Sequence, residues 1–295
     1  MAPLLILQAL ANGLIIGSIY ALMACGLTLI FGVMNIINVA HGEFLMLAMY
    51  ACYFLYALYG IDPYLSILIV FPLSFAFGIL IFRVFIKPIF DNPDIEEPMM
   101  NQVLVTIGLS LVLENGMLGL FSADYRTINL KYAEVTYHLG KVSISLSQLI
   151  VFVCTVAVIL ALYWLLRSTD WGRFVRAVTE NREAALLMGV NVPRIYLLSF
   201  GLGIGILGIA GPLLVPIYYT YPSIGVSFLL TAFVVVVLGG MGSFIGALVG
   251  GLIIGIVESL GATFMPGSMA PVLTFSVFIL LLLFKPEGLF GVKAS

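Results

Sequence analysis

The polar residues best placed to contact a solute lie close together, between positions 32 and 43. Asn35, Asn38, His41 and Glu43 interrupt a long run that is otherwise apolar. Polar groups at membrane depth are costly unless they face protein or a water-filled path, and an interrupted helix frees backbone groups that can bind a carboxylate or an ammonium. The segment therefore predicts the border of a translocation path. The alternative is a short cytoplasmic turn between two helices, with Asn35 as a helix cap.

A further carboxylate lies deep in an apolar run near the C-terminus. Glu258 extends a row of glycines at four-residue steps: Gly242, Gly246 and Gly250. Such spacing gives a helix one small-residue face for close contact with another helix. We therefore expect Glu258 to point into protein, where it pairs with a polar side chain or lines the path. Glu114 lies beside Asn115 towards the outer end of another apolar run, and we assign it no role.

A basic, amphipathic stretch is suited to binding another molecule. Its arginines are Arg167, Arg173, Arg176, Arg182 and Arg194. Within it, Glu183, Ala184 and Ala185 open a short helix. Gly189 fits the left-handed position after that helix, and Pro193 prevents its continuation. A short helix with two small alanines on its surface fits a groove in a partner protein. The alternative is an amphipathic helix that lies on lipid headgroups.

Residues for catalysis or metal binding are scarce. The chain has two histidines and three cysteines, without metal-ligand spacing or a nucleophile paired with a base. Cys25, Cys52 and Cys154 lie far apart in apolar runs, so we interpret them as small buried residues. The sequence has no Gly-x-x-x-x-Gly-Lys-Ser/Thr phosphate loop. We therefore predict neither an enzyme nor a chain with its own nucleotide site, metal or cofactor.

The composition requires a lipid environment for these side chains. Of the 295 residues, 62% are hydrophobic and 9% are charged, and the mean hydropathy is +1.20. Soluble domains carry about 25% charged residues, and a soluble fold of this size could not bury so much apolar surface. The net charge of −2 argues against the basic face of a nucleic-acid-binding protein. We predict an all-α, polytopic membrane bundle, with residues 1–295 as one transmembrane domain.

Apolar runs of about 20 residues, the length of a membrane-spanning helix, recur along the chain. We predict spans near 4–31, 36–59, 64–87, 101–121, 148–167, 195–219, 222–241, 243–263 and 268–285. The region 222–263 is too long for one span and is divided at the glycine-rich segment 239–243, so eight or nine crossings result. Gly211, Pro212 and Pro216 predict a kink in the span that begins near 195.

The basic residues of the loops set the orientation, because positive residues concentrate on the cytoplasmic side. The arginine-rich loop 168–194 is therefore predicted to be cytoplasmic. Counting crossings from it places the C-terminus in the cytoplasm and the N-terminus outside. Loop 122–147 also falls outside, although it holds three basic residues of its own. Alternation of Val142, Ile144 and Leu146 with serines predicts a short hairpin in that outer loop.

Several segments, in their order along the chain, resemble one known family. Glu183-Ala184-Ala185-x-x-x-Gly189 resembles the EAA-x-x-x-G coupling motif of ABC importer permeases. Branched-chain amino acid permeases of the LivH/LivM type, and LivH more closely, are similar to this chain at segments 17–22, 26–32, 35–43, 239–246 and 284–291. The resemblance covers nearly the whole chain.

The resemblance implies a function, partners and site residues. The chain would be the membrane-spanning permease subunit of an ABC importer in a bacterial inner membrane, translocating branched-chain amino acids or similar small amino-acid-like solutes. It would assemble with a second related permease, two cytosolic ATPases that bind ATP, and a periplasmic substrate-binding protein. The contact with the ATPases would be made by Arg182, Glu183, Ala184, Ala185 and Gly189. We call residues 168–194 the coupling segment.

Two alternatives stay open at this point. One is a urea or short-amide permease of the same family. The other is a stand-alone secondary carrier or channel that uses Glu43, His41 or Glu258 for ion coupling. Transport by the purified chain without ATPases would favour the carrier, whereas co-purification with two ATPases would favour the importer.

Overall fold

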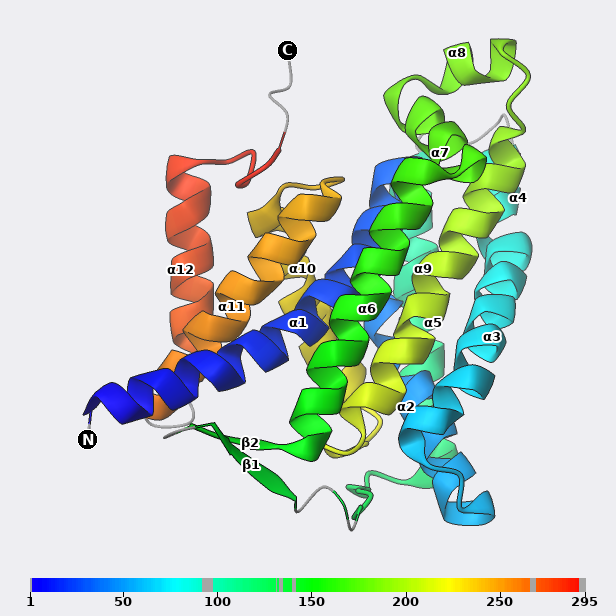
Figure 1. The fold of residues 1–295 in the computed structure, drawn as a ribbon. Helices are drawn as coiled ribbons and strands as arrows, with labels where there is room; N and C mark the ends of the chain where they lie inside the picture. The colour runs from blue at the N-terminus through cyan, green and yellow to red at the C-terminus, as the bar shows by residue number, and fades with distance from the viewer. Residues whose placement is uncertain are drawn as a thin grey trace. The chain divides into compact units, whose positions relative to one another are not determined.

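The computed structural model describes residues 2–91, 98–130, 132, 135–139, 142–265 and 269–291. Most described residues are helical, and Figure 1 shows the elements in chain order. The helices are α1 Ala2–Met34, α2 His41–Tyr59, α3 Pro63–Ile81, α4 Lys87–Asp91, α5 Pro98–Phe121, α6 Leu146–Ser168, α7 Asp170–Glu180, α8 Arg182–Leu187, α9 Val192–Leu214, α10 Ile224–Gly239, α11 Phe244–Phe264 and α12 Ala270–Phe284. A π-helical turn, Phe82–Ile86, joins α3 to α4, and one hairpin pairs β1 Thr136–Leu139 with β2 Val142–Ser145. The predicted all-α membrane bundle is confirmed.

Among the described residues, seven helices are long and apolar enough to cross a membrane. They cover Leu4–Met34, His41–Tyr59, Pro63–Phe90, Met99–Phe121, Leu146–Ser168, Val192–Leu214 and Phe244–Phe264. Two shorter apolar helices, Ile224–Gly239 and Pro271–Phe284, occupy the remaining predicted spans. At 1.5 Å per residue, the 16 residues of α10 reach about 24 Å, less than the hydrocarbon core of about 30 Å. The predicted eight or nine crossings therefore correspond to seven full-length helices and two short ones.

The predicted division of the 222–263 region is present, and glycines cause it. Gly240 and Gly242 have φ angles of +99° and +84°, a conformation that residues with a Cβ rarely adopt. Ser243 then caps α11, because its Oγ accepts a hydrogen bond from Gly246 N at 3.0 Å. A Cβ on Gly239 would lie 2.3 Å from the Gly246 backbone, so only glycines allow α10 and α11 to meet this closely.

The contacts divide the chain into two compact units. The first combines Met1–Thr28, Asn129–Ile159 and Leu230–Ser295, and the second combines Leu29–Ile128 with Leu160–Leu229. Three helices, α1, α6 and α10, therefore contribute residues to both units. Each unit contains its own closely packed helices.

In the first unit, α1 and α11 meet backbone to backbone. A Cβ added to Gly255 would lie 2.3 Å from Gly17 Cα, and one on Gly251 would lie 2.6 Å from Ala21 Cα. Near the same contact, Ser259 Oγ donates a hydrogen bond to the Ala9 carbonyl at 2.8 Å. In lipid, the hydrophobic effect does not drive helices together. Close packing of the small residues on both helices stabilises this contact instead.

In the second unit, α9 packs against α3 and α2 through a face of glycines. These glycines are Gly201, Gly205, Gly208 and Gly211. A Cβ added to Gly208 would lie 2.7 Å from Ser74 Cβ on α3, and one on Gly211 would lie 2.7 Å from Ala48 Cβ on α2. The three helices therefore form one block in which a displacement of α9 is resisted by both neighbours.

The end of α9 differs from the predicted span 195–219. Pro212 lies inside the helix, and the last helical residue is Leu214. Because proline lacks an N–H and crowds the preceding turn, the helix does not continue far beyond it. The predicted interruption is present, and it shortens the helix by five residues relative to the predicted end.

The first part of the predicted outer loop is attached to α2 and α5. Arg126 N donates to Thr220 O at 3.0 Å, and Thr220 N donates to Arg126 O at 2.7 Å. The Arg126 guanidinium donates to Phe121 O at 2.7 Å. It lies 5.4–5.8 Å from the ring centres of Tyr50, Tyr53, Phe54 and Phe121. A cation among aromatic rings is stabilised by them. These contacts give Arg126 a structural role, so its positive charge does not indicate on which side of the membrane the loop lies.

The later part of that loop forms the predicted hairpin. β1 and β2 are antiparallel, with Thr136 opposite Ser145, and Leu146 begins α6 instead of extending the strand. Gln8 of α1 binds the hairpin backbone twice: its Nε2 donates to Ser143 O at 2.8 Å, and its Oε1 accepts from Ser143 N at 2.9 Å. The hairpin is thereby fixed to α1 within the first unit.

Candidate functional site

The coupling segment folds into two short helices ahead of α9. Thr169 caps α7, because its Oγ1 accepts a hydrogen bond from Gly172 N at 3.1 Å. Asn181 caps α8 in the same way, accepting from Ala184 N at 2.9 Å. Gly189 follows α8 with a φ angle of +81°, the left-handed conformation that favours glycine. The predicted short helix and its glycine terminator are both present.

α9 begins within the last residues of this segment. Asn191 Oδ1 accepts from Arg194 N at 3.1 Å and caps α9, so the helix starts at Val192, three residues earlier than predicted. Pro193 lies in the first turn of α9, where its missing N–H is tolerated, and it therefore opens the next helix as well as ending the previous one. Figure 1 shows α7 and α8 beyond this end of α9, and the α2–α3 turn near the opposite end.

The surface of α8 differs from the prediction at one of its two alanines. Ala184 is exposed as expected, whereas Ala185 is only 4% exposed. The prediction that both alanines lie on the surface is wrong for Ala185, because α8 packs against α7 and α9 and buries one face. The open face instead presents two large apolar side chains, Leu187 at 89% and Met188 at 84% exposure. Apolar side chains this exposed, outside the membrane-spanning helices, are typical of an interaction surface.

Arg182, at the start of α8, connects the coupling segment to two other helices. Its guanidinium lies 5.9 Å from the ring centre of Phe90 on α4 and 5.7 Å from that of Tyr196 on α9. Each contact has the geometry of a cation–π interaction. A displacement of α8 is therefore resisted at α4 as well as through the chain connection to α9.

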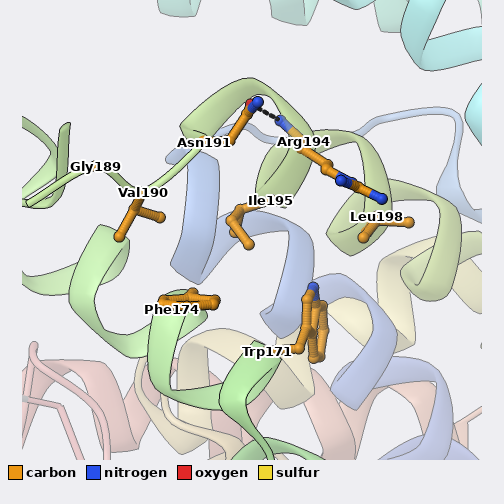
Figure 2. Close-up of a pocket in the computed structure, with 8 residues that line it drawn as sticks. All are labelled: Trp171, Phe174, Gly189, Val190, Asn191, Arg194, Ile195 and Leu198. Atoms are coloured by element: carbon orange, nitrogen blue, oxygen red, sulfur yellow. Dashed lines mark hydrogen bonds between the residues drawn. The ribbon is translucent and has the colours of Figure 1, made fainter.

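A cavity of about 420 Å³ lies between α7 and the start of α9. Figure 2 shows its lining: Trp171, Phe174, Gly189, Val190, Asn191, Arg194, Ile195 and Leu198. Most of these side chains are apolar, and the Trp171 indole N–H has no hydrogen-bond partner among the described residues. The cavity adjoins the exposed end of α8 through Gly189 and Val190. Six of its eight lining residues belong to the coupling segment, so it is not a separate site.

The residues predicted to border a path do not share one environment. Asn38, His41 and Glu43 are fully buried, whereas Asn35 is exposed. Asn35 has a φ angle of +55° and donates its backbone N–H to Phe31 O at 2.7 Å, so it ends α1 and does not cap the following helix. α2 begins at His41 and not at 36, because residues 35–38 have no regular secondary structure and residues 39–40 form a turn. The structure therefore places three of the four residues at the buried start of α2.

Polar groups of α5 contact this start of α2 within the second unit. Ser110 Oγ donates to Glu43 Oε1 at 3.3 Å. Thr106 Oγ1 accepts from Val39 N at 3.3 Å. On the other side, a Cβ added to Gly225 in the first turn of α10 would lie 2.5 Å from Glu43 Oε2. The Glu43 carboxyl is therefore held between α5 and α10.

The polar residues of α5 were not among the residues predicted to border the path, although their spacing in the sequence indicates a shared helix face. Gln102, Thr106, Ser110 and Glu114 stand at four-residue steps in an otherwise apolar span. Four-residue steps place side chains on one face of a helix. The first three are buried, which identifies this polar face as the one turned towards protein.

Glu258 belongs to the first unit and is half-buried on α11. Tyr20 of α1 forms a hydrogen bond with its side chain. The predicted glycine row is interrupted, because Gly242 lies in the turn before α11 and not on the helix. Gly246 and Gly250, which do precede Glu258 on α11, pack against α10.

Comparison with known proteins shows a similarity that covers nearly the whole chain. The family described as branched-chain amino acid transport system / permease component matches residues 9–284. The high-affinity branched-chain amino acid transport system permease protein BraD of Pseudomonas aeruginosa is 34% identical over 301 residues, covering 97% of this chain and 95% of BraD. The corresponding LivH of Escherichia coli K12 is 34% identical over 298 residues, again covering 97% and 95%. The solved structure of PsaBC from Streptococcus pneumoniae in complex with Fab aligns with a TM-score of 0.52 at 12% identity, over 95% of this chain and 91% of that chain. It shares the fold.

Proposed function

Because this chain belongs to the branched-chain amino acid transport system permease component family, we propose that it is the membrane-spanning subunit of an ATP-driven importer. The solutes are branched-chain amino acids or similar small amino-acid-like molecules, the class stated in the names of its relatives. Two cytosolic ATPases, a second related permease and a substrate-binding protein complete the importer. ATP binds to the ATPases, and no cofactor is assigned to this chain.

The observation that supports this function best is the open face of α8. A small exposed residue, Ala184, lies beside the exposed apolar pair Leu187 and Met188, on a short capped helix outside the membrane-spanning segments. A small residue permits close approach, and apolar neighbours gain free energy when a partner covers them. This surface fits the groove of an ATPase subunit better than it fits lipid headgroups, because Glu183 is acidic and the guanidinium of Arg182, the basic residue of α8, lies against Phe90 and Tyr196.

The structure also suggests how movement of an ATPase reaches the membrane. α9 continues directly from the coupling segment, and Arg182 ties α8 to α4 and α9. The glycine face of α9 then transfers a displacement to α3 and to α2, whose first turn carries Glu43. In this scheme the chain converts ATPase closure into a shift of the block formed by α2, α3 and α9.

The orientation belongs to the same proposal. The coupling segment and the C-terminus face the cytoplasm of a bacterial inner membrane, and loop 122–147 faces the outside. The five arginines between 167 and 194 support this, because basic residues concentrate in cytoplasmic loops.

Replacing Arg182 with alanine is expected to reduce uptake several-fold more than ATP hydrolysis. Its two aromatic contacts are together worth about 1–2 kcal/mol at a partly exposed site, and they transmit movement without contributing to ATP binding. The measurement is the ratio of solute imported to ATP hydrolysed in proteoliposomes. Arg173→Ala is the matched control, because Arg173 forms an ion pair with Asp170 at 3.0 Å and both side chains are well exposed. An unchanged ratio in Arg182→Ala would contradict the proposed link.

The proposed function itself is tested by reconstituting the chain with its permease, ATPase and binding-protein partners. We expect ATP-dependent uptake of radiolabelled L-leucine and no uptake by this chain alone. Urea in place of leucine tests the related alternative of a urea or short-amide permease. Equal transport by the chain alone, without ATP, would instead identify a stand-alone carrier.

A further inference from the structure

Three buried polar residues of α5 lie on one face of the helix, at four-residue steps. Gln102, Thr106 and Ser110 are buried, whereas apolar residues elsewhere on the helix, such as Leu111 and Val112, are exposed. A membrane helix normally turns apolar residues to lipid and reserves polar ones for contacts with protein or solute. The polar face of α5 is therefore turned inward, towards the start of α2.

These residues and the start of α2 form one continuous group. Ser110 binds the Glu43 carboxyl, and Thr106 binds the backbone beside Asn38. We call Asn38, Glu43, Gln102, Thr106 and Ser110 the α2–α5 polar site. All five lie in the second unit, and none is more than 9% exposed.

The α2–α5 polar site has hydrogen-bonding capacity that the described chain does not use. Glu43 Oε2 is buried without a hydrogen-bond partner among the described residues, and the same holds for both amide atoms of Asn38. Leaving a buried carboxylate oxygen and a buried amide without partners costs several kcal/mol in total. A transporter tolerates this free-energy cost when a solute binds the unpartnered atoms in one part of the transport cycle and leaves them in another.

The charges around Glu43 indicate which partner fits. A second carboxylate, Glu114, acts on it electrostatically and lies at the next step of the same α5 face. Two carboxylates with hydroxyl and amide neighbours attract a cation that carries several N–H donors. An α-ammonium group has this chemistry, and a carboxylate or an uncharged amide does not.

We propose that the α2–α5 polar site receives the ammonium group of the transported solute, with Glu43 Oε2 as its charge partner and Asn38 and Ser110 as neutral hydrogen-bonding groups. The inference rests on the proposed function, since it needs an amino-acid-like solute. The site is closed in this conformation, because Gly42 and Gly225 are in direct contact beside it and the first turn of α10 covers Glu43. Solute gains access when this contact between α2 and α10 opens.

The test uses the complete importer with radiolabelled L-leucine as the probe. Glu43→Gln keeps the size of the side chain and an acceptor for Ser110 but removes the charge. We expect leucine uptake to fall about ten- to hundredfold, the usual effect of losing a charge-assisted hydrogen bond. ATP hydrolysis stimulated by the binding protein should stay within about twofold of the unmodified importer, because the coupling segment is untouched.

Two further variants separate solute binding from a structural role. Glu43→Asp keeps the charge and should recover part of the uptake. Asn115→Ala removes an exposed amide of the same helix, whose Nδ2 donates to Leu111 O at 2.8 Å, and should leave uptake unchanged. Normal uptake in Glu43→Gln would overturn the inference, as would an equal loss of uptake, ATP hydrolysis and complex yield in both Glu43 variants. Absence of ATP-driven uptake in the unmodified importer would instead contradict the proposed function.

Discussion

Replacing Ala184 with arginine is expected to abolish ATP-driven uptake while the chain still inserts into the membrane. Ala184 is exposed on the capped helix α8, so the larger side chain meets no crowded neighbour within the folded chain. In the assembled importer, the same side chain would bury an unpaired charge against an ATPase, at a cost of about 3–5 kcal/mol. Because 1.4 kcal/mol corresponds to a tenfold change, ATPase affinity should fall at least about a hundredfold. Leucine uptake and recovery of the ATPases with the purified permease measure the effect.

The control for this variant is Ala184→Ser, which adds one small polar atom at the same exposed position and should retain most uptake. Ala185 is unsuitable for the same test, because it is buried against α7 and α9 and a large residue there would disturb the segment itself. Full uptake by Ala184→Arg, with normal amounts of the variant in the membrane, would rule out this surface as the ATPase contact.

The double variant Leu187→Ser, Met188→Ser is expected to weaken ATPase binding by about two orders of magnitude. Both side chains are highly exposed, so their removal should leave the thermal stability of the isolated chain unchanged. Covering each by a partner contributes about 1.5 kcal/mol or more, which together amounts to about 3 kcal/mol of binding free energy. The measurement is the dissociation constant of the ATPases from the permease in detergent.

Tyr59→Ser provides the comparison for the double variant. Tyr59 is a similarly exposed large residue at the end of α2, and Figure 1 places that end of the second unit opposite α8. It should bind the ATPases normally. Equal loss of ATPase binding in Tyr59→Ser and in the double variant would show that removing any exposed apolar side chain weakens binding. The α8 surface would then have no specific role.

Much of the fold follows from patterns that the sequence displays directly. The glycines at 239–243 predict a break because they permit φ angles that other residues avoid, and the structure has the break there. The helix at 182–187 and its terminator follow from helix formers, an asparagine cap and Gly189. The ends of the helices are less evident from the sequence. The helix α2 starts five residues later than predicted, because Asn35 takes a left-handed conformation and residues 35–38 have no regular secondary structure, which apolar periodicity does not reveal.

The candidate site was predicted less completely, for two physical reasons. Burial of Ala185 depends on α7 and α9 packing around α8, and a six-residue helix gives no periodic signal for its buried face. The contact between Ser110 and Glu43 joins residues 67 positions apart, so it depends on tertiary structure. The four-residue spacing of polar residues on α5 could have identified that face from the sequence, because in lipid a polar row predicts an inward face.

Cross-linking from position 187 in the assembled importer tests the central claim most directly. A photoreactive residue, Leu187→p-benzoylphenylalanine, would occupy a position on α8 whose side chain is 89% exposed. Irradiation should yield a covalent product between this chain and an ATPase subunit, and ATP should change its yield. Products with the substrate-binding protein, or with lipid alone, would contradict the account, because α8 would then face the outside or lie on the membrane.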